Sequence, residues 1–303
     1  MRVAVVGANG QVGQTLVQAF AERGDQVTPL THAEIEIGSL ESVLACLSAP
    51  QPEVVVNTAA MHHVENCETE PDKAYAANGL GARNLALVTS TLGALLIHIS
   101  TDYVFDGSKD QPYVEEDAPF PLNVYGNTKL AGEYFVRSLN EKHFVLRTSA
   151  LYGKYPCRAK GGKNFPDLML HLARERGKVR VVDSEVVSPT SVLELARQII
   201  TLTGCDAYGL YHATGEGSCS WYDFARELFT ATHTKVDLQV AAPNEFPAKV
   251  RRPSYSVLEN RGLKRLGLNC FSSWQDALQE YLGQAGDRRV SSLSGKAAQV
   301  PQR

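Results

Sequence analysis

The first thirteen residues, Met1-Arg-Val-Ala-Val-Val-Gly7-Ala-Asn-Gly10-Gln-Val-Gly13, join a short apolar run directly to a glycine-rich turn. The turn fits the pattern G-x-x-G-x-x-G and is followed by an apparent helix over 14–22. Glycine allows a tight turn and a close approach of the backbone, and the free N–H groups at a helix N-terminus attract a pyrophosphate. The stretch therefore predicts a dinucleotide-binding turn, with an ordinary tight turn as the alternative.

Further short apolar runs, each followed by a helix-like segment, recur through the first half of the chain. The runs cover 2–6, 26–30, 54–58, 95–99 and 144–148. Strands that are buried on both faces form continuous runs of this kind, and their alternation with helices is typical of parallel βαβ units. We therefore expect an α/β fold with a Rossmann-type, doubly wound parallel sheet, whose ligands bind beyond the carboxyl ends of the strands.

The pattern loosens after residue 150 and predicts a second, smaller α/β lobe for the substrate, interleaved with the first domain. Residues 1–150 are expected to form the NAD(P)-binding domain, to which 183–204 return. The substrate lobe would then comprise 151–182 and 205–283. Residues 284–303 show no periodic apolar face, so we expect a mobile tail there.

The composition argues against several classes of protein. Hydrophobic residues make up 44% of the 303, and 30 Lys and Arg stand against 33 Asp and Glu without a basic run, so nucleic acid is not an expected partner. Six scattered cysteines form no C-x-x-C pair, which indicates a reducing, cytoplasmic location. The first apolar run is too short for a signal peptide, and no run reaches the ~20 residues that span a bilayer, so we expect no membrane contact.

The end of the second apolar run lacks the carboxylate that usually binds the adenosine ribose. The sequence reads Thr31-His32 there, and no arginine for a 2′-phosphate stands at that position. The choice between NADPH and NADH therefore stays open, with a slight preference for NADPH. Glu36 and Ile37 are candidates for the adenine pocket, although a solvated loop position explains Glu36 nearly as well.

The segment Tyr125-Gly-Asn-Thr-Lys129 places a phenol and an ammonium four residues apart, hence on the same side of a helix. Reduction of a carbonyl group needs a proton donor beside the oxygen that gains negative charge. The ammonium of Lys129 is expected to lower the pKa of Tyr125 from about 10 toward neutrality, and to hold a ribose hydroxyl of the cofactor. The pattern Y-x-x-x-K is common by chance, so a catalytic role for Tyr125 and Lys129 needs support from other motifs in the sequence.

Thr101 and Asp102 follow the apolar run 95–99 at the carboxyl end of a predicted strand. The Thr101 hydroxyl is placed to hydrogen-bond a substrate carbonyl, and a helix cap or turn residue is the alternative. Asp102 would orient a sugar hydroxyl or cap the turn, and the sequence does not separate these two roles.

Several longer motifs together point to one family. They are Ser100-Thr-Asp-Tyr-Val-Phe-Asp-Gly107, Pro121-Leu-Asn-Val-Tyr-Gly-Asn-Thr-Lys-Leu-Ala-Gly-Glu133, Val56-Asn-Thr-Ala-Ala60 and Arg147-Thr-Ser149, joined by 182–190, 209–214 and 252–258. The chain resembles the dTDP-4-dehydrorhamnose reductase family of extended short-chain dehydrogenases over nearly everything before the tail. The resemblance implies that NADPH or NADH reduces the C4 keto group of a nucleoside-diphospho-4-keto-6-deoxyhexose, in the first place dTDP-4-dehydrorhamnose to dTDP-rhamnose.

The resemblance also implies roles for individual residues. Tyr125 would be the proton donor and Lys129 its partner, while Thr101 and Asp102 would touch the sugar. Together with the glycines of the turn, the residues expected along the dinucleotide are Gly7, Gly10, Gln11, Val12, Gly13, Glu36, Ile37, Ala60, Met61, His62, Tyr125 and Lys129.

Two arginines are candidates for the diphosphate of the substrate. Arg251 and Arg252 lie in a predicted loop of the second lobe, and a guanidinium matches phosphate oxygens bidentately. Solvation of at least one of them at the surface is equally compatible with the sequence.

The chain departs from the family pattern at two places. Ala150 stands where members often carry a tryptophan that stacks on the sugar, so a different or less tightly held hexose fits as well. Met61-His62-His63 replaces the more common tyrosine or histidine followed by threonine. No set of carboxylates completes a metal site with these histidines, so we expect contact with cofactor or substrate and no bound metal.

Two other functions stay open. A related sugar-nucleotide reductase or epimerase would use the same residues, but an epimerase shows no net consumption of NADPH. A non-catalytic regulatory subunit, resembling the methionine adenosyltransferase beta subunit, would keep the fold and bind a partner enzyme, and the intact Thr101, Tyr125 and Lys129 argue against it. The sequence also leaves a homodimer open.

Overall fold

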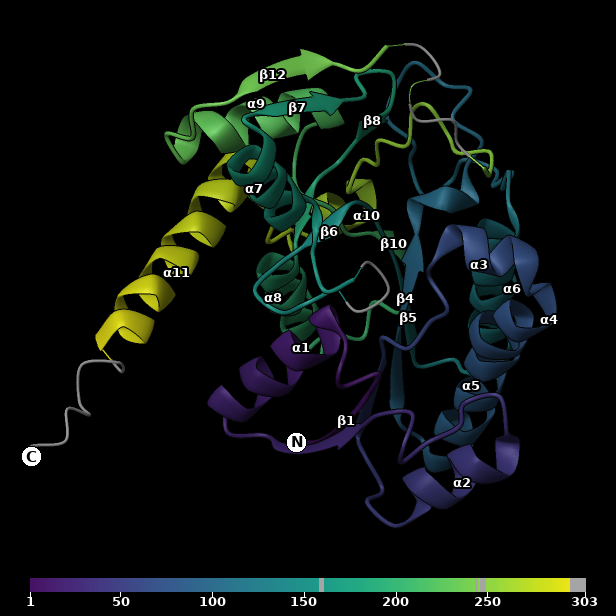
Figure 1. Cartoon of the computed structure of the whole chain (residues 1–303). Coiled ribbons are helices and arrows are strands. Elements are labelled where there is room, and N and C mark those ends of the chain that lie inside the picture. The colour runs from purple at the N-terminus through teal and green to yellow at the C-terminus, as the bar shows by residue number, and fades with distance from the viewer. Residues whose placement is uncertain (158–160, 243–244, 246–248, 295–303) are drawn as a thin grey trace, which may run out of the picture.

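The computed structural model describes residues 1–157, 161–242, 245 and 249–294. Within these ranges, six strands form one parallel sheet in the order β10-β5-β4-β3-β1-β2 (Figure 1). They are β1 (Arg2–Val6), β2 (Gln26–Leu30), β3 (Val54–Asn57), β4 (Leu95–Thr101), β5 (His143–Thr148) and β10 (Gly209–His212). The sheet grows outward from β1 in both directions, which confirms the expected doubly wound α/β fold.

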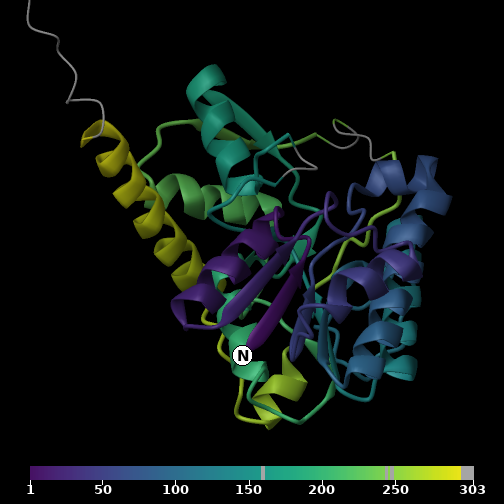
Figure 2. The same cartoon turned by 90° about the horizontal axis from the view of Figure 1, so that it is seen from below.

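Helices cover both faces of this sheet because successive side chains of each strand point to opposite faces. Val3 and Val5 of β1 pack with α1 (Gln11–Glu22) and α8 (Val192–Leu202). Ala4 and Val6 pack on the other face with α2 (Leu40–Ser48), α5 (Gly81–Leu92) and α6 (Val124–Leu139). Figures 1 and 2 show the two groups of helices on opposite sides of the sheet. None of the helices in the described ranges is both long and apolar enough to cross a membrane.

A second lobe with its own hydrophobic core stands above the carboxyl ends of the sheet strands (Figure 1). Its strands are short and pair two by two: β7 (Lys178–Val181) with β12 (Asp237–Val240), and β8 (Val186–Val187) with β11 (Cys219–Ser220). Its helices are α7 (Phe165–Arg176), α9 (Trp221–Ala231) and α11 (Trp274–Ser294). The remaining elements are α3 (Val64–Thr69), α4 (Pro71–Ala74), η1 (Tyr75–Leu80), η2 (Asp102–Val104), β6 (Leu151–Tyr152), β9 (Thr190–Ser191) and α10 (Arg261–Arg265).

The boundary between the domains differs from the sequence-based expectation at one point. β10 pairs in parallel with β5 in the main sheet, so the return to the first domain includes 209–212, which the sequence assigned to the substrate lobe. At the other end, α11 continues to Ser294 through the first part of the expected tail. The mobile tail stays a prediction for 295–303, which lie outside the described residues.

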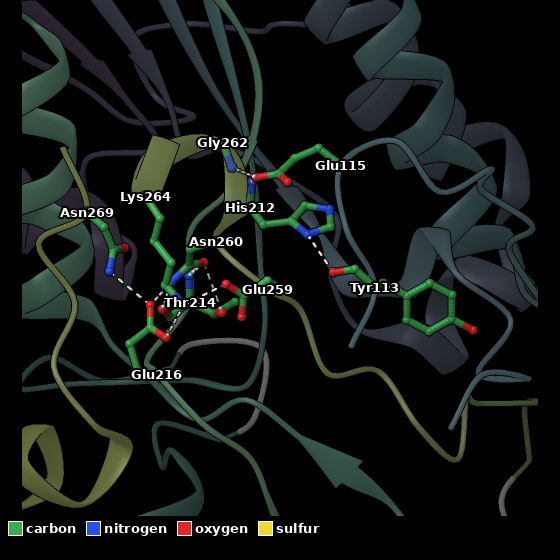
Figure 3. Close-up of polar contacts among 10 residues, drawn as sticks. All are labelled: Tyr113, Glu115, His212, Thr214, Glu216, Glu259, Asn260, Gly262, Lys264 and Asn269. Atoms are coloured by element: carbon green, nitrogen blue, oxygen red, sulfur yellow. Dashed lines mark hydrogen bonds and ion pairs between the residues drawn. The ribbon is translucent and has the colours of Figure 1, made fainter. Parts of the chain in front are cut away.

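A buried polar network ties the C-terminal part of the chain to the end of β10 (Figure 3). The side chain of Asn260 accepts the N–H of Thr214 at 3.0 Å and donates to the carbonyl oxygen of Thr214 at 2.7 Å and to Glu216 Oε1 at 2.9 Å. Glu115 Oε1 accepts the N–H of His212 at 3.0 Å. These bonds hold the segment that runs from the candidate arginines Arg251 and Arg252 to Asn260 against the first domain.

Candidate active site

The glycine-rich turn lies between β1 and α1, at the carboxyl end of a central strand. Gly7 has a φ of +81°, and a Cβ on Gly13 would overlap the carbonyl oxygen of Gly7. Gln11, Val12 and Gly13 form the first turn of α1, which Gly10 precedes without a capping side chain. Gln11 Oε1 is buried and has no hydrogen-bond partner among the residues that the structure describes. Free N–H groups at the helix N-terminus suit a pyrophosphate, so the turn fits a dinucleotide.

The loop after β3 is clamped to α6 by a residue that the sequence did not reveal. Asn78 Oδ1 accepts the N–H of Met61 at 2.9 Å, and Asn78 Nδ2 donates to the carbonyl oxygen of Met61 at 2.9 Å. The same Nδ2 donates to Thr128 Oγ1 at 3.0 Å. Asn78 belongs to the π-helical turn η1, a type of turn that often marks functional sites. The backbone of Met61 is therefore held in place relative to the helix that carries Tyr125 and Lys129.

Ala60 and His62 flank Met61 in this loop. His62 Nδ1 lies 3.4 Å from the carbonyl oxygen of Ala60, and His62 Nε2 lies 3.9 Å from Cys157 Sγ. Cys157 follows β6 in the polar stretch where the second lobe begins. The histidine therefore brings the start of that lobe beside the loop.

Glu36 and Ile37 lie beyond β2 but differ in exposure. The Glu36 side chain is 54% exposed, accepts the N–H of Gly38 at 2.9 Å and lies 3.4 Å from His32 Nδ1. The Ile37 side chain is buried in the core, where a Cβ on Gly81 of α5 would lie 2.7 Å from it. The side chain of Ile37 therefore belongs to the core, whereas Glu36 presents its carboxylate to solvent.

Tyr125 lies in the first turn of α6, which approaches η2 closely. Asn123 caps the helix by accepting the N–H of Gly126 at 2.8 Å, and a Cβ on Gly126 would overlap the carbonyl oxygen of Tyr103. This contact brings the Tyr125 phenol beside Thr101 and its ring edge-on to Tyr103, at 5.9 Å between centroids. The phenol and the Thr101 hydroxyl therefore meet beyond the carboxyl end of β4.

The expected effect of Lys129 on Tyr125 is wrong for this structure. Removal of the phenol from water raises the pKa of Tyr125 well above its ordinary value, although the hydrogen bond with Thr101 opposes this. Lys129 Nζ instead donates to the carbonyl oxygen of Ile99 at 2.6 Å and lies 3.3 Å from His98 Nε2. Burial lowers the pKa of Lys129 to about 8, against the opposing charge of Glu133.

Thr101 and Asp102 serve the fold as well as the site. Thr101 Oγ1 accepts the N–H of Tyr103 at 3.1 Å, as a cap of η2, and donates to Asp102 Oδ1 at 3.0 Å. Asp102 Oδ2 accepts hydrogen bonds from Ser149 at 2.7 Å and Ser256 at 2.6 Å. The Asp102 carboxylate is thus engaged with hydroxyls of the chain, whereas the side chain that caps the turn is that of Thr101.

A buried ion pair fixes α6 against the two strands beneath it. Arg147 Nη2 of β5 lies 2.7 Å from Glu133 Oε2 of α6, and both side chains are at most 3% exposed. Ser100 Oγ of β4 donates to Glu133 Oε1 at 2.5 Å. The sequence placed Glu133 and Arg147 in motifs without a role; here they hold the helix of Tyr125 in register with the strand of Thr101.

Arg252 lies opposite the start of α3. Its Nη2 is 2.5 Å from Glu65 Oε1, and the neighbouring Arg251 accepts a hydrogen bond from Asn123 Nδ2 at its carbonyl oxygen, at 2.9 Å. The Arg252 side chain is one-third exposed. Ala150 follows Ser149 with a φ of +46° and continues the chain into the second lobe.

Comparisons with known proteins agree with this geometry. The family model described as RmlD substrate binding domain matches residues 1–286. The chain is 38% identical over 281 residues to the spore coat polysaccharide biosynthesis protein SpsK of Bacillus subtilis, which covers 93% of this chain and 96% of that protein. It is 34% identical over 288 residues to the dTDP-4-dehydrorhamnose reductase of Sinorhizobium fredii, with 91% and 95% covered.

A solved structure shows the same fold at a similar level of identity. The dTDP-4-dehydrorhamnose reductase of Bacillus anthracis, crystallised in complex with NADP, superimposes with a TM-score of 0.89 at 37% identity. The superposition covers 93% of this chain and 99% of that one. The family match spans nearly the whole described chain, and the glycine-rich turn and the Thr101–Tyr125 pair lie together at one edge of the sheet. This chain therefore belongs to the dTDP-4-dehydrorhamnose reductase family of extended short-chain dehydrogenases.

Proposed function

We propose that this protein reduces the C4 keto group of a nucleoside-diphospho-4-keto-6-deoxyhexose, with dTDP-4-dehydrorhamnose, giving dTDP-rhamnose, as the first candidate. As a member of its family, it is an NAD(P)H-dependent oxidoreductase. The observation that supports the proposal most is the placement of Thr101 beside Tyr125 beyond β4, two strands from the glycine-rich turn after β1. One edge of the sheet thus offers a cradle for a dinucleotide and two hydroxyls for a carbonyl oxygen.

The dinucleotide, when bound, supplies the hydride for the carbonyl carbon. Tyr125 donates its phenolic proton to the carbonyl oxygen as that oxygen gains electron density. The raised pKa of Tyr125 keeps the phenol protonated until this moment. Thr101 lies beside the phenol, and its hydroxyl is held in place because it donates to Asp102 Oδ1 and accepts from the N–H of Tyr103.

The other candidate residues bind rather than react. Lys129 holds a ribose hydroxyl of the dinucleotide, and the clamped backbone of Met61 forms the wall beside it. Arg252 contributes to binding of the substrate diphosphate, in exchange for part of its contact with Glu65. Asp102 orients Thr101 and, through Ser256, joins the second lobe to the catalytic edge.

Assays with defined sugar nucleotides test the proposal. The purified protein is mixed with dTDP-4-keto-6-deoxyhexoses and NADPH or NADH, and cofactor oxidation is followed together with NMR analysis of the sugar. We expect one cofactor oxidised for each 4-hydroxy product formed. A changed sugar without net cofactor oxidation would identify an epimerase, and no reaction with any 4-keto sugar nucleotide would contradict the proposal.

A further inference from the structure

Three buried polar side chains form a row beneath the Tyr125 helix, and two of them, Asn57 and His98, have no role in the proposed function above. Asn57, His98 and Lys129 are 1%, 1% and 2% exposed. Asn57 of β3 and His98 of β4 are partners in the sheet register, so their side chains point to the same face. Lys129 reaches them from α6, where a Cβ on Gly132 would lie 3.4 Å from His98 Nε2. The close approach that requires a glycine there is to the carbonyl oxygen of Asn78, which a Cβ on Gly132 would overlap at 2.5 Å.

The hydrogen-bond partners determine which nitrogen of His98 carries the proton. The backbone N–H of Ala59 can only donate, and it points at Asn57 Oδ1 at 3.1 Å. The amide of Asn57 must therefore turn its Nδ2 toward His98 Nδ1, at 3.0 Å. Because Nδ2 is a donor, Nδ1 has to accept, and the neutral ring carries its proton on Nε2.

The same reasoning extends to Lys129. The protonated Nε2 of His98 faces Lys129 Nζ at 3.3 Å, and an ammonium has no lone pair with which to accept that proton. A neutral amine accepts it and still donates to the carbonyl oxygen of Ile99 at 2.6 Å. The row of hydrogen bonds from Ala59 to Lys129 is complete only when Lys129 is uncharged.

The charged groups around the row are compatible with uncharged side chains at both His98 and Lys129. Glu133 faces Lys129 from the same helix, but its carboxylate is engaged bidentately by Arg147 of β5. Burial lowers the pKa of Lys129 to about 8 and the pKa of His98 well below its ordinary value, and the charge of Lys129 adds to the effect on His98. Burial and hydrogen bonding thus favour the same protonation states.

We propose that His98 is a positioning residue for Lys129. The side chain of Asn57, which is itself fixed by the N–H of Ala59, holds the His98 ring in place. His98 in turn holds Lys129 Nζ beside the carbonyl oxygen of Ile99 and stabilises the neutral amine. Ala59 begins the loop that leads to Met61, so the row also couples the position of that loop to the protonation of Lys129. Consequences for turnover rest on the proposed function, whereas the claim about protonation does not.

Two substitutions separate the two ring nitrogens of His98. The side-chain oxygen of asparagine can take the position of Nδ1, but the side chain does not reach the position of Nε2. His98→Asn therefore keeps an acceptor for Asn57 and loses the contact with Lys129. Glutamine reaches the position of Nε2, so His98→Gln can still donate to Lys129. His212→Asn is the matched control, because His212 is equally buried and lies in the separate network of Figure 3.

The titration of Lys129 is followed by NMR of the full-length protein with labelled lysine, without substrate. We expect wild type to titrate near the pKa of about 8, and His98→Gln and His212→Asn to match it. In His98→Asn the pKa of Lys129 should rise by about one pH unit, because the neutral amine has lost its donor. The pH dependence of kcat should move in the same direction.

Nitrogen NMR of the wild-type protein reads the tautomer of His98 directly and depends on no variant. The proton should reside on Nε2. A proton on Nδ1, or an unchanged titration of Lys129 in His98→Asn, would overturn the proposal, and equal losses of stability without a pKa change would indicate a merely structural histidine. Because neither NMR measurement uses a sugar nucleotide, a failed reductase assay beside the expected spectra would overturn the proposed function alone.

Discussion

The carboxylate of Asp102 is buried at the end of β4, where three hydroxyl groups from separate segments donate to it. These belong to Thr101, Ser149 and Ser256. Burial nevertheless raises the pKa of Asp102, because removal from water penalises the charged form more than the hydroxyls stabilise it. The folded chain therefore binds this proton more tightly than the unfolded chain. Its contribution to stability is fully present below about pH 3.9 and is lost as pH rises through the folded pKa.

Replacement of this acid by its amide should therefore change the pH dependence of stability. In Asp102→Asn the amide can donate to the serine hydroxyls, which are able to accept. We expect the free energy of unfolding of wild type to fall relative to that of Asp102→Asn as pH rises above about 4. Urea unfolding at a series of pH values measures this difference.

Asp106→Asn is the control with the opposite sign. Hydrogen bonds, led by the backbone N–H of Ser108, lower the pKa of Asp106, so its contribution is present above the unfolded pKa and lost as pH falls. The free energy of unfolding of wild type should therefore rise relative to that of Asp106→Asn as pH rises toward about 3.9, and the difference should stay level above that pH, where wild type falls relative to Asp102→Asn. The account of Asp102 fails if both variants show the same slope against wild type.

The site residues could be predicted from the sequence to different degrees. The spacing of Tyr125 and Lys129 predicts a shared helix face, but the end of a long lysine side chain is positioned by tertiary partners, here Ile99 and His98. A histidine inside the apolar run 95–99 looks like an ordinary core residue. Its partner Asn57 is separated from it by 41 residues, so only the pairing of β3 with β4 brings the two together.

The N-terminus of α6 is the element on which the site depends most. Asn123 caps it by accepting the N–H of Gly126 and also donates to the carbonyl oxygen of Arg251. Asn123→Ala should lower the free energy of unfolding by about 1 kcal/mol for the cap alone. It should also reduce kcat, because Tyr125 lies two residues after the cap.

Ser39→Ala offers a matched control on a helix that does not carry Tyr125. Ser39 caps α2 by accepting the N–H of Ser42 at 3.3 Å. We expect a comparable loss of stability in urea unfolding and an unchanged kcat. Equal kcat values for the two variants would show that the start of α6 does not position the phenol.

The elements themselves follow the sequence closely wherever burial decides them. The apolar runs 2–6 and 144–148 correspond to β1 and β5, because strands covered on both faces need continuous apolar residues. The run 26–30 corresponds to β2, an edge strand in which only Leu30 is buried. β10 was harder to assign: it has only four residues, of which His212 is the fully buried one, and it lies at the edge of the sheet. Its pairing with β5 is decided by tertiary packing that short-range patterns do not contain.

The whole molecule joins its two lobes at the catalytic edge of the sheet. Ser256 and Arg252 return from the C-terminal part of the chain to meet Asp102 and Glu65 of the first domain. The network of Asn260 and Glu115 holds this returning segment against β10 (Figure 3). The interleaved lobes therefore share residues around one site, which lies where ligands of doubly wound sheets bind.

The central claim is that the Tyr125 phenol, placed at this shared edge, protonates the carbonyl oxygen. The most direct test compares Tyr125→Phe with Tyr134→Phe, a variant of an exposed tyrosine on the same helix, in turnover of a 4-keto sugar nucleotide and in affinity for NADPH. Tyr125→Phe should lose about 10²- to 10⁴-fold in kcat with dinucleotide affinity retained, while Tyr134→Phe matches wild type. Reduction by Tyr125→Phe at the wild-type rate would contradict the assignment of the proton donor.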